Sequence, residues 1–307
     1  MIPQVIAVVG ATATGKSDLA LDLAEELGGE VVNADAMQLY RGMDIGTNKL
    51  PVDQRRGIPH HLFDVLEVTD EATLADYQSR AETTIAEILG RGHVPVLAGG
   101  SGLYVRAALD HLEIPPTDPA VRARLETQAQ DEGGSDALRH RLRELDPAAA
   151  EAIEPNNIRR IIRALEVVEI TGRPFSATAP TKRYRRPSLV IGLRDDWDAL
   201  TQRIERRARG MWEGGLLDEV ARLDAAGLRG GRTASRAIGY AQALGELDGR
   251  WGREEAIADT SRATRRYARR QESWWRPDPR VEWLDAAGAD LRAAALDLTR
   301  RPTQWTP

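Results

Sequence analysis

Hydrophobic and polar positions along this chain form two kinds of segment that alternate. Short apolar runs bounded by turn residues are typical of buried strands. They occupy residues 6–9, 30–35, 94–98 and 188–193. Apolar residues at helical spacing follow the first run, at Leu19, Leu23 and Leu27, and recur over residues 72–92. Because strands that alternate with helices pair in parallel, the pattern predicts an α/β fold built on a parallel sheet.

The pattern changes in the middle of the chain. From about residue 115 to 187, charged helical segments with frequent proline replace the alternation of strands and helices. The strand at 188–193 returns to the first sheet, and further helical segments follow it at 197–211 and 216–226. The predicted organisation is an α/β core over residues 1–115 and 188–307, with a helical C-terminal part, and a mainly helical insertion domain over residues 116–187.

The first strand leads into the sequence GATATGKS, which is a P-loop motif. Its glycines let successive backbone N–H groups turn inward at a helix N-terminus, where an anion is stabilised. Lys16 adds a positive charge, and the Ser17 hydroxyl is a ligand suited to Mg²⁺. The predicted phosphate-binding residues are Gly10, Ala11, Thr12, Ala13, Thr14, Gly15, Lys16 and Ser17. A glycine-rich turn without a ligand is the plainer interpretation, and the strand and helix on either side argue against it. The motif predicts a bound polyphosphate and leaves the reaction open.

Asp35 ends the second predicted strand. Ligands bind at the carboxyl edge of parallel strands, so we expect Asp35 near the P-loop. An N-cap for the following turn is an equally good interpretation from spacing alone. The third strand ends at Ala98 and is followed by glycines and Ser101, where a phosphoryl-transferring P-loop enzyme usually has an aspartate for Mg²⁺.

Composition limits the class of protein. The chain has 307 residues and is 42% hydrophobic, which is enough for a full core, and no apolar run is long enough to cross a bilayer. The first strand begins within a few residues of Met1, so we expect no signal peptide and a cytoplasmic location. The absence of cysteine excludes disulfides, thiolate zinc sites and thiol nucleophiles, and the five histidines lack metal-ligand spacing.

The net charge of -5 hides two basic regions. Residues 155–186 carry a local charge of +6, and Arg159, Arg160 and Arg163 share one helical face. Between Arg262 and Arg276, six arginines face a single carboxylate, Glu272. Intrahelical ion pairing does not balance this second stripe, which predicts an anionic partner. A solvated helix face is the plainer interpretation of the first region. Trp274 and Trp275 at the end of the stripe fit either core packing or stacking on bases, and we expect at least one in the core.

Together these segments resemble the bacterial tRNA dimethylallyltransferases, which transfer a prenyl group from dimethylallyl diphosphate to the adenosine beside the anticodon. The resemblance covers nearly the whole chain. It rests on GATATGKS at 10–17, DAMQLYRGMDIGTNK at 35–49, PHHLFDV at 59–65, GGSGLYVRAAL at 99–109, DPAVRARL at 118–125, PNNIRRIIRALEV at 155–167, RAIGY at 236–240 and RRQESWWR at 269–276. The motifs after the P-loop are the more specific ones. Ser101 stands where the family often has threonine, and Ala11 and Ala36 stand where it often has proline and serine.

The resemblance implies roles for particular residues. The P-loop would hold the diphosphate of the prenyl donor with Mg²⁺, Asp35 would be the general base, and Gln38 would contact the target adenine. The implied catalytic residues are Asp35, Thr12, Lys16, Ser101 and Arg122. The expected tRNA contacts are Asp35, Ala36, Met37, Gln38, Ser101, Arg122, Arg159, Arg160, Arg163, Arg236, Gly239, Tyr240, Arg265, Arg269, Arg270, Trp274 and Arg276. The expected partners are the tRNA anticodon arm and dimethylallyl diphosphate, with no membrane, and the chain is expected to be a monomer.

The chemistry of these residue types fits such a reaction. The amino group of adenine is a weak nucleophile, so a carboxylate such as Asp35 must accept its proton during attack on the allylic carbon. Negative charge builds on the departing diphosphate, where Lys16, Arg122, backbone N–H groups and Mg²⁺ on Ser17 would stabilise it. Thr12 would orient either Asp35 or a diphosphate oxygen. The target base must leave its stack to reach the site, so the protein needs phosphate contacts as well as a pocket.

Two other functions are compatible with the P-loop. One is an ATP-dependent kinase acting on a small molecule or nucleotide, since the same loop binds ATP. The missing carboxylate after Ala98 and the basic helices argue against this kinase. The other is an RNA-binding regulator that uses a nucleotide only to change shape, and binding without turnover would identify it.

Overall fold

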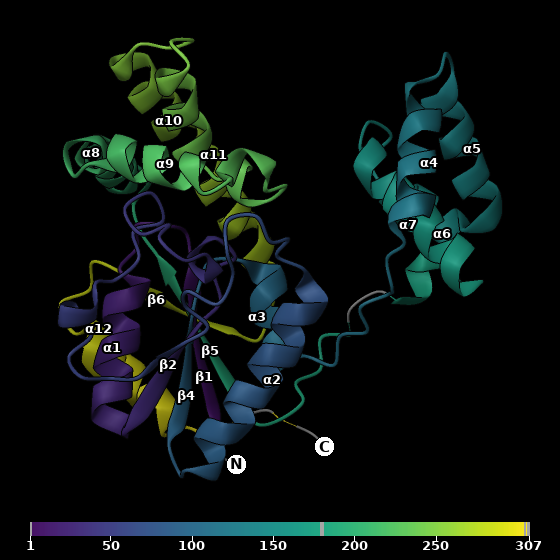
Figure 1. Ribbon diagram of the computed structural model, residues 1–307. Coiled ribbons are helices and arrows are strands. Elements are labelled where there is room, and N and C mark those ends of the chain that lie inside the picture. The colour runs from purple at the N-terminus through teal and green to yellow at the C-terminus, as the bar shows by residue number, and fades with distance from the viewer. Residues whose placement is uncertain (1, 179–180, 304, 306–307) are drawn as a thin grey trace. The chain divides into compact units, whose positions relative to one another are not determined.

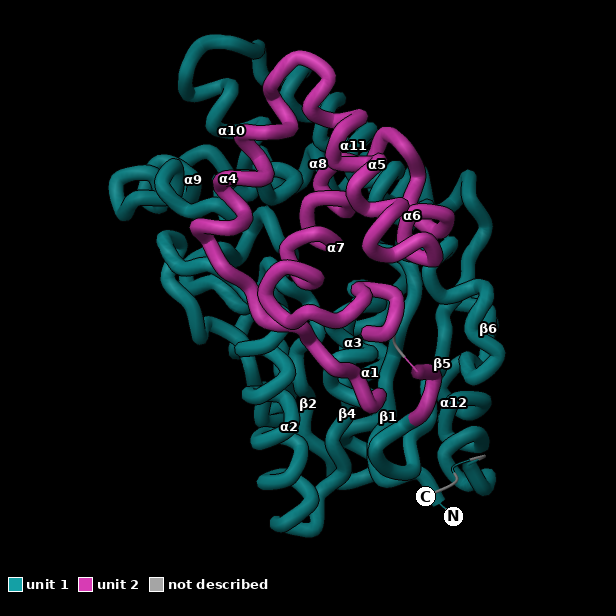
Figure 2. The backbone as a smooth tube through the Cα atoms, turned by 90° about the vertical axis from the view of Figure 1, so that its right-hand side faces the viewer, with its two compact units in different colours: residues 1–109, 184–307 teal, residues 110–183 magenta. Residues whose placement is uncertain are grey.

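The computed structural model describes residues 2–178, 181–303 and 305. The chain forms two compact units, which are coloured separately in Figure 2. Unit 1 comprises residues 1–109 and 184–307, and unit 2 comprises residues 110–183. We had expected the insertion at residues 116–187.

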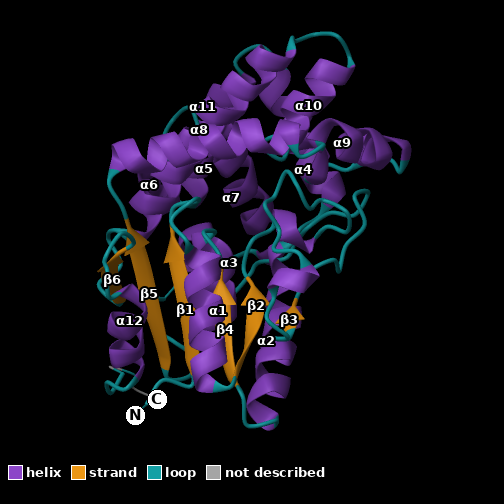
Figure 3. Ribbon diagram, turned by 90° about the vertical axis from the view of Figure 1, so that its left-hand side faces the viewer, coloured by secondary structure: helices purple, strands orange, loops and turns teal. Residues whose placement is uncertain are grey.

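Unit 1 is built on a parallel sheet with the strand order β3-β2-β4-β1-β5-β6 (Figure 3). The strands are β1 (Val5–Gly10), β2 (Gly29–Asn33), β3 (His60–His61), β4 (Val94–Ala98), β5 (Ser188–Arg194) and β6 (Val281–Asp285). The predicted α/β fold with a parallel sheet is confirmed. All four strands expected from apolar runs are present, and β3 and β6 were not expected. The two residues of β3 are too few to show periodicity. The sequence VEWLD of β6 has no continuous apolar run, because β6 is a half-exposed edge strand.

Helices cover both faces of the sheet (Figure 1). On one face lie α1 (Lys16–Leu27) and α12 (Leu291–Thr299), and on the other lie α2 (Leu74–Gly90) and α3 (Gly102–Leu109). The face with α1 and α12 has a core in which Ile6 and Val8 of the sheet meet Leu23 and Leu298. These side chains leave water almost completely, and each contributes about 1.5–3 kcal/mol of hydrophobic stabilisation.

A third group of helices lies at the carboxyl edge of the sheet, to which the strand arrows in Figure 3 point. These helices are α8 (Trp197–Glu213), α9 (Leu216–Ala225), α10 (Tyr240–Leu247) and α11 (Arg253–Trp275). The apolar side of α8 packs Leu200 and Ile204 against Ala268 of α11 and against Ala11 and Ala13 of the P-loop. The arginine-rich helices are therefore anchored directly above the loop that follows β1.

Unit 2 is a small helical bundle. It contains α4 (Pro119–Gln130), α5 (Gly134–Leu145), α6 (Pro147–Ala152) and α7 (Ile158–Thr171). Leu125, Leu138, Leu142, Ile161 and Leu165 form its buried core. Asp118 and Asp146 accept backbone N–H groups at the starts of α4 and α6, each of which has proline in its first turn. No helix among the described residues is long and apolar enough to cross a membrane.

Residues 36–64 are rich in Gly, Pro, Asp and His and have little periodicity, a pattern that predicts loops around the site rather than core. The segment contains short 3₁₀ turns and little other regular structure, yet Leu39, Tyr40, Met43 and Leu62 are buried. A buried loop must satisfy its own backbone polar groups, and its sequence shows no periodicity that would reveal burial. The expectation that this segment lies outside the core was wrong.

The buried carboxylate of Glu30 in β2 contacts a histidine in β3 and another directly before β4. Glu30 of β2 has a side chain only 3% exposed and accepts a hydrogen bond from Arg91 Nη2 at 2.7 Å. Its oxygens also contact His61 Nε2 at 2.5 Å and His93 Nδ1 at 2.7 Å. The Arg91 guanidinium is the main cause that lowers the Glu30 pKa to about 2, with the two imidazoles adding to the effect.

We predict that Glu30→Gln lowers the free energy of unfolding by about 1–3 kcal/mol at pH 7. Because the pKa of Glu30 is lower in the folded state, ionised Glu30 stabilises the fold above about pH 4.3 and loses this effect as pH falls toward 2. Urea unfolding at pH 7 and pH 3.5 measures the difference between variant and wild type, which should shrink at the lower pH. Glu87→Gln on the exposed side of α2 is the control, and an equal loss in both variants would contradict the prediction.

Candidate active site

The P-loop connects β1 to α1 in a conformation that exposes backbone N–H groups. Gly10 has a φ of 139°, and a Cβ at this position would lie 2.5 Å from the carbonyl oxygen of Leu193 in β5. Gly15, the N-cap of α1, has a φ of 83° and no side chain to cap the first turn. The first N–H groups of α1 are therefore available to an anion.

A cleft of about 140 Å³ opens beside this loop at the carboxyl edge of the sheet. All residues that line it belong to unit 1. Its polar wall includes Thr12, Lys16, Ser17, Asp35, Gln38 and Arg207. Leu50 and Phe63 add apolar surface. The structure thus brings the P-loop, the end of β2 and the 3₁₀ turn after it to one cleft, as the strand-edge rule predicts.

Lys16 is a half-buried cation in this cleft. Its Nζ donates a hydrogen bond to the carbonyl oxygen of Ala11 at 2.5 Å. Burial, together with the charge of Arg207, lowers the pKa of Lys16 to about 8, while the charge of Asp35 opposes both effects. Lys16 makes no ion pair closer than 4 Å with any residue that the structure describes. An anion in the cleft would restore the pKa of Lys16 and relieve the cost of burying its charge.

Arg207 of α8 is a site residue that sequence reasoning missed. Its Nη1 lies 3.4 Å from Thr12 Oγ1, and burial lowers the pKa of its guanidinium. One turn earlier on the same helix, Arg203 Nε donates to the carbonyl oxygen of Ala13 at 3.0 Å. The arginine-rich composition of 197–211 was the available signal. Sequence alone did not show which arginines of this helix face the P-loop.

Asp35 is not the N-cap of the following 3₁₀ turn, because that position is taken by Ala36, but its carboxylate still contacts the turn. Its Oδ1 accepts the backbone N–H of Met37 at 2.9 Å, which stabilises the following turn. Asn33 Oδ1 in turn accepts the Asp35 N–H at 2.8 Å. The Asp35 carboxylate also lines the cleft, where burial raises its pKa. A carboxylate with a raised pKa is a stronger base than an exposed aspartate.

Gln271 of α11 occupies the edge of β4 where the sequence lacks a carboxylate. Its Oε1 accepts the Thr12 N–H at 2.8 Å. A Cβ on Gly100 would overlap the Gln271 amide, so the glycines after β4 make room for this side chain. Ser101 lies next in the chain and is half-buried directly before α3. It is not among the described residues that line the cleft, and its catalytic role stays a prediction.

Two of the expected tRNA contacts in the RAIGY motif need correction. Tyr240 is completely buried and donates its hydroxyl hydrogen to Glu219 Oε1 at 2.6 Å. Gly239 is also buried, and its N–H is donated to Gln242 Oε1. Neither the Tyr240 side chain nor the Gly239 backbone is accessible to RNA in this structure, whereas Arg236 is exposed. The motif was recognised correctly, but its tyrosine points into the protein.

Three arginines of the basic stripe have carboxylate partners within the protein. Arg262 pairs with Asp259 of α11, Arg276 at the end of this helix pairs with Glu272, and Arg265 pairs with Glu205 of α8. Ion pairs within the helix therefore do not balance the stripe, as expected, and one of its arginines takes a carboxylate from another helix. These pairs are largely exposed and worth little, so they leave the arginines able to bind phosphate.

The aromatic residues at the end of α11 divide as expected. Trp275 is 1% exposed and belongs to the core, while Trp274 is 39% exposed. The Arg106 guanidinium lies 5.2 Å from the centre of a Trp274 ring. Earlier in α11, the Arg269 guanidinium lies over the Trp197 ring and the Arg270 guanidinium lies over the Tyr267 ring.

The predicted residues of unit 2 centre on a buried carboxylate. Glu166 accepts hydrogen bonds from Arg122 Nη2 at 2.8 Å and from Arg163 Nη1 at 2.9 Å. Arg163 also donates to the carbonyl oxygens of Pro115 and Pro116. Arg163 therefore has a structural role within unit 2, while Arg159 and Arg160 are exposed. The catalytic role of Arg122 stays a prediction.

Comparisons with known proteins show the family of this chain. The sequence model of the family described as IPP transferase matches residues 38–278, and that of isopentenyl transferase matches residues 3–56. The tRNA dimethylallyltransferase of Streptomyces coelicolor is 56% identical over 98% of this chain and 97% of its own. That of Thermobifida fusca is 58% identical over 95% of this chain and 93% of its own. This chain belongs to the tRNA dimethylallyltransferase family.

Solved structures of the family support the same assignment. The tRNA isopentenylpyrophosphate transferase of Bacillus halodurans matches with a TM-score of 0.70 and 40% identity, over 97% of this chain and 94% of that one. A eukaryotic dimethylallyltransferase acting on tRNA matches with a TM-score of 0.83 and 28% identity, over 98% of this chain and 80% of that one. Membership in this family favours prenyl transfer to tRNA over the kinase alternative.

We predict that affinity for diphosphate falls as pH rises through about 8, because Lys16 loses its charge there. Lys16→Arg should remove this pH dependence, since a guanidinium stays protonated. Titration calorimetry with magnesium diphosphate between pH 6.5 and 9.5 measures the effect. Protonation of the ligand itself affects both proteins equally. The same dependence of affinity on pH in wild type and variant would therefore contradict the assignment to Lys16.

Proposed function

We propose that this chain transfers a dimethylallyl group from dimethylallyl diphosphate to N6 of the adenosine adjacent to the anticodon in tRNA. The observation that carries the proposal is one cleft that joins a carboxylate of raised pKa, Asp35, to the cationic P-loop. In the reaction the N6–C1 bond forms, the C1–O bond of the donor breaks and diphosphate leaves. The N6 proton goes to Asp35.

The charges in the cleft favour departure of diphosphate. Lys16, Arg207 and the N–H groups at the start of α1 face the place where its negative charge develops. Such groups are fixed before reaction, so they stabilise the transition state without reorganising. Thr12, whose hydroxyl lies near Arg207, is placed to orient a diphosphate oxygen. The apolar surface of Leu50 and Phe63 suits the prenyl chain.

We propose Mg²⁺ as the cofactor, and the residues at the start of α1 fit it. Ser17 is exposed at the cleft, with Asp18 beside it. No group of three or more His, Asp or Glu side chains among the described residues could hold a metal. Mg²⁺ typically binds through one or two protein ligands together with phosphate oxygens and water. When bound, it offsets charge on the diphosphate.

We propose that exposed arginines bind the tRNA. Arg159 and Arg160 in unit 2 and the stripe on α11 in unit 1 are the candidates, with Arg236 and the half-exposed Trp274. The target base must be unstacked before Asp35 reaches it, so binding energy from phosphate contacts is needed. We further propose that the chain acts as a monomer in the cytoplasm.

Mass spectrometry of tRNA nucleosides tests the reaction and its base. Unmodified tRNA incubated with the protein, Mg²⁺ and dimethylallyl diphosphate should gain one dimethylallyl group on adenosine. Asp35→Asn should slow the transfer by about 10²–10⁴-fold, while the exposed control Asp53→Asn should not. Consumption of ATP in a parallel sample without a prenyl gain would favour the kinase, and binding of tRNA without any turnover would favour the regulator.

The role of the α11 stripe is tested by the salt dependence of tRNA binding. Each lost phosphate contact lowers the slope of log K against log salt by about 1. Replacing Arg265 and Arg269 by glutamine should therefore weaken binding and reduce the slope by up to about 2. Arg292→Gln on α12 is the matched control. An unchanged slope in the double variant would exclude the stripe from the tRNA interface.

A further inference from the structure

Residues 36–50 include Gln38, the side chain to which the family resemblance gives a contact with the target adenine. Gln38, Thr47, Asn48 and Leu50 of this segment all line the cleft. Gln38 Nε2 donates to the carbonyl oxygen of Thr47 at 3.1 Å and lies 3.5 Å from that of Asn48. Because a carbonyl only accepts, the NH₂ group of the Gln38 amide must face these oxygens. Its Oε1 is then left to accept a hydrogen bond from a ligand.

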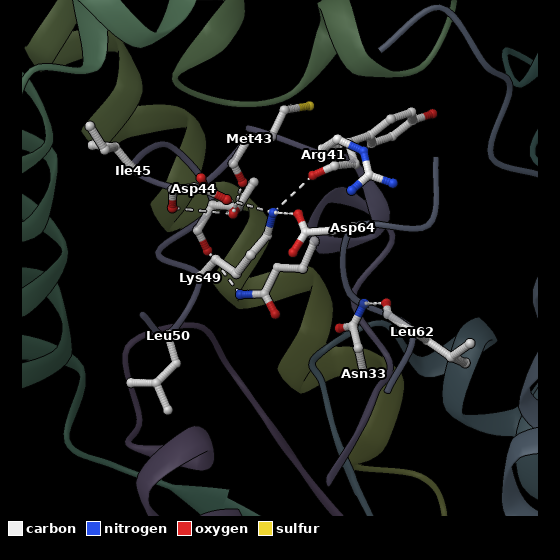
Figure 4. A network of polar contacts seen from close by, with 12 residues as sticks. Asn33, Arg41, Met43, Asp44, Ile45, Lys49, Leu50, Leu62 and Asp64 are labelled. Carbon is white, nitrogen blue, oxygen red and sulfur yellow. Dashed lines mark hydrogen bonds and ion pairs between the residues drawn. The ribbon is translucent and has the colours of Figure 1, made fainter. Parts of the chain in front are cut away.

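A buried lysine folds this segment from within. Lys49 has a side chain 3% exposed and donates to Asp44 Oδ1 and Asp64 Oδ1, each at 2.7 Å. It also donates to the carbonyl oxygen of Tyr40 at 2.8 Å. Figure 4 shows its ammonium group between Asp44 and Asp64. All three donors of Lys49 have acceptors, so the two ends of the 40–49 loop are fixed to each other.

A buried carboxylate holds the same segment from outside. Glu219 of α9 is 2% exposed. Its Oε2 accepts the N–H of Ile45 at 2.8 Å and of Asp44 at 3.2 Å, and its Oε1 lies 3.4 Å from the N of Gly46. Tyr240 of α10 donates its hydroxyl to the same Oε1 at 2.6 Å. A Cβ on Gly46 would overlap the Tyr240 ring, so the ring packs directly on this turn.

The chemistry of Glu219 is unusual for a purely structural joint. Among the described residues no cation lies within ion-pair distance of its carboxylate, and all its partners are neutral donors. Burying a charge in this way is costly, and a neutral residue of the same shape would avoid the cost. In return, a carboxylate that accepts successive backbone N–H groups makes charge-assisted hydrogen bonds, which fix a turn more tightly than neutral ones.

We propose that Glu219 and Tyr240 are positioning residues for selection of the target base. They hold the turn at residues 44–46, which sets the carbonyls of Thr47 and Asn48 and through them the orientation of the Gln38 amide. The Gln38 oxygen then accepts from the exocyclic amino group of adenine and opposes a base with a carbonyl there. The inference rests on the proposed function and adds a role for the RAIGY tyrosine, which does not touch substrate.

The test compares Tyr240→Phe and Glu219→Gln with a control in the same helices. Glu246→Gln is the control because Glu246 of α10 accepts from Trp212 Nε1 at 2.6 Å and from Arg253 Nε at 3.1 Å, and has no hydrogen bond or ion pair with the 36–50 segment among the described residues. The substrates are dimethylallyl diphosphate and an anticodon stem–loop RNA with the target adenosine. A second stem–loop carries inosine at the target position and serves as a competitive inhibitor, because inosine presents a carbonyl in place of the amino group.

We expect kcat/KM for the adenosine RNA to fall on the order of tenfold in Tyr240→Phe, the effect of one buried hydrogen bond, and further in Glu219→Gln. The KM for dimethylallyl diphosphate and the Kd for magnesium diphosphate should stay within about twofold of wild type. The preference for adenosine RNA over inosine RNA should shrink by a similar factor in both variants. The control should match wild type in all four quantities.

Each other outcome counts against the inference. Wild-type kinetics for the adenosine RNA in both variants would overturn it, as would an equal loss of diphosphate binding, which would indicate general damage to the fold. An unchanged preference for adenosine over inosine would show that the turn does not orient Gln38. Prenyl transfer by the wild-type protein is measured first. If the wild-type protein transfers no prenyl group, the proposed function itself is overturned.

Discussion

The arrangement of unit 1 depends on positive charge held at one edge of the sheet without a carboxylate in ion-pair contact with it. Lys16 and Arg207 are half-buried beside the N-terminus of α1, and neither has an ion-pair partner within 4 Å among the described residues. A protein that buries two cations side by side loses stability, as the lowered pKa values of both groups show. A polyphosphate bound in the cleft would remove this cost, so the site is built for a ligand that is itself strongly anionic.

The surrounding elements follow from this constraint. The P-loop must keep its N–H groups open to the cleft, so it is supported from behind. Arg203 holds the carbonyl of Ala13, and Gln271 holds the N–H of Thr12. Glycines after β4 leave space for Gln271, at the edge where a phosphoryl-transfer enzyme usually has an aspartate. Asp35, which follows β2, lines the cleft, and burial prepares it to accept a proton.

The errors in the expectations share one cause. Segment 36–64 has the composition of a surface loop, yet several of its side chains are buried. Tyr240 ends a motif that begins with an exposed arginine, yet it is buried as well. In each case burial depends on a polar partner far away in the chain, such as Glu219, which binds residues more than 170 positions earlier. The α11 stripe likewise finds one of its carboxylates on α8. Composition within a window cannot show partners outside it.

By itself the sequence determined the α/β class, four of the six strands, the P-loop, the place of Asp35 and the likeness to a family, because each depends on local periodicity or on a contiguous motif. Strand-edge geometry then sufficed to predict that Asp35 and the P-loop meet. Only the tertiary structure decided which arginine of α8 enters the cleft and how Lys49 and Glu219 fix the 36–50 segment. It alone also placed Gln271 at the edge of β4 where a phosphoryl-transfer enzyme usually has a carboxylate. Those features arise from contacts between distant helices and loops, whose side chains acquire their roles only when packing removes water from around them.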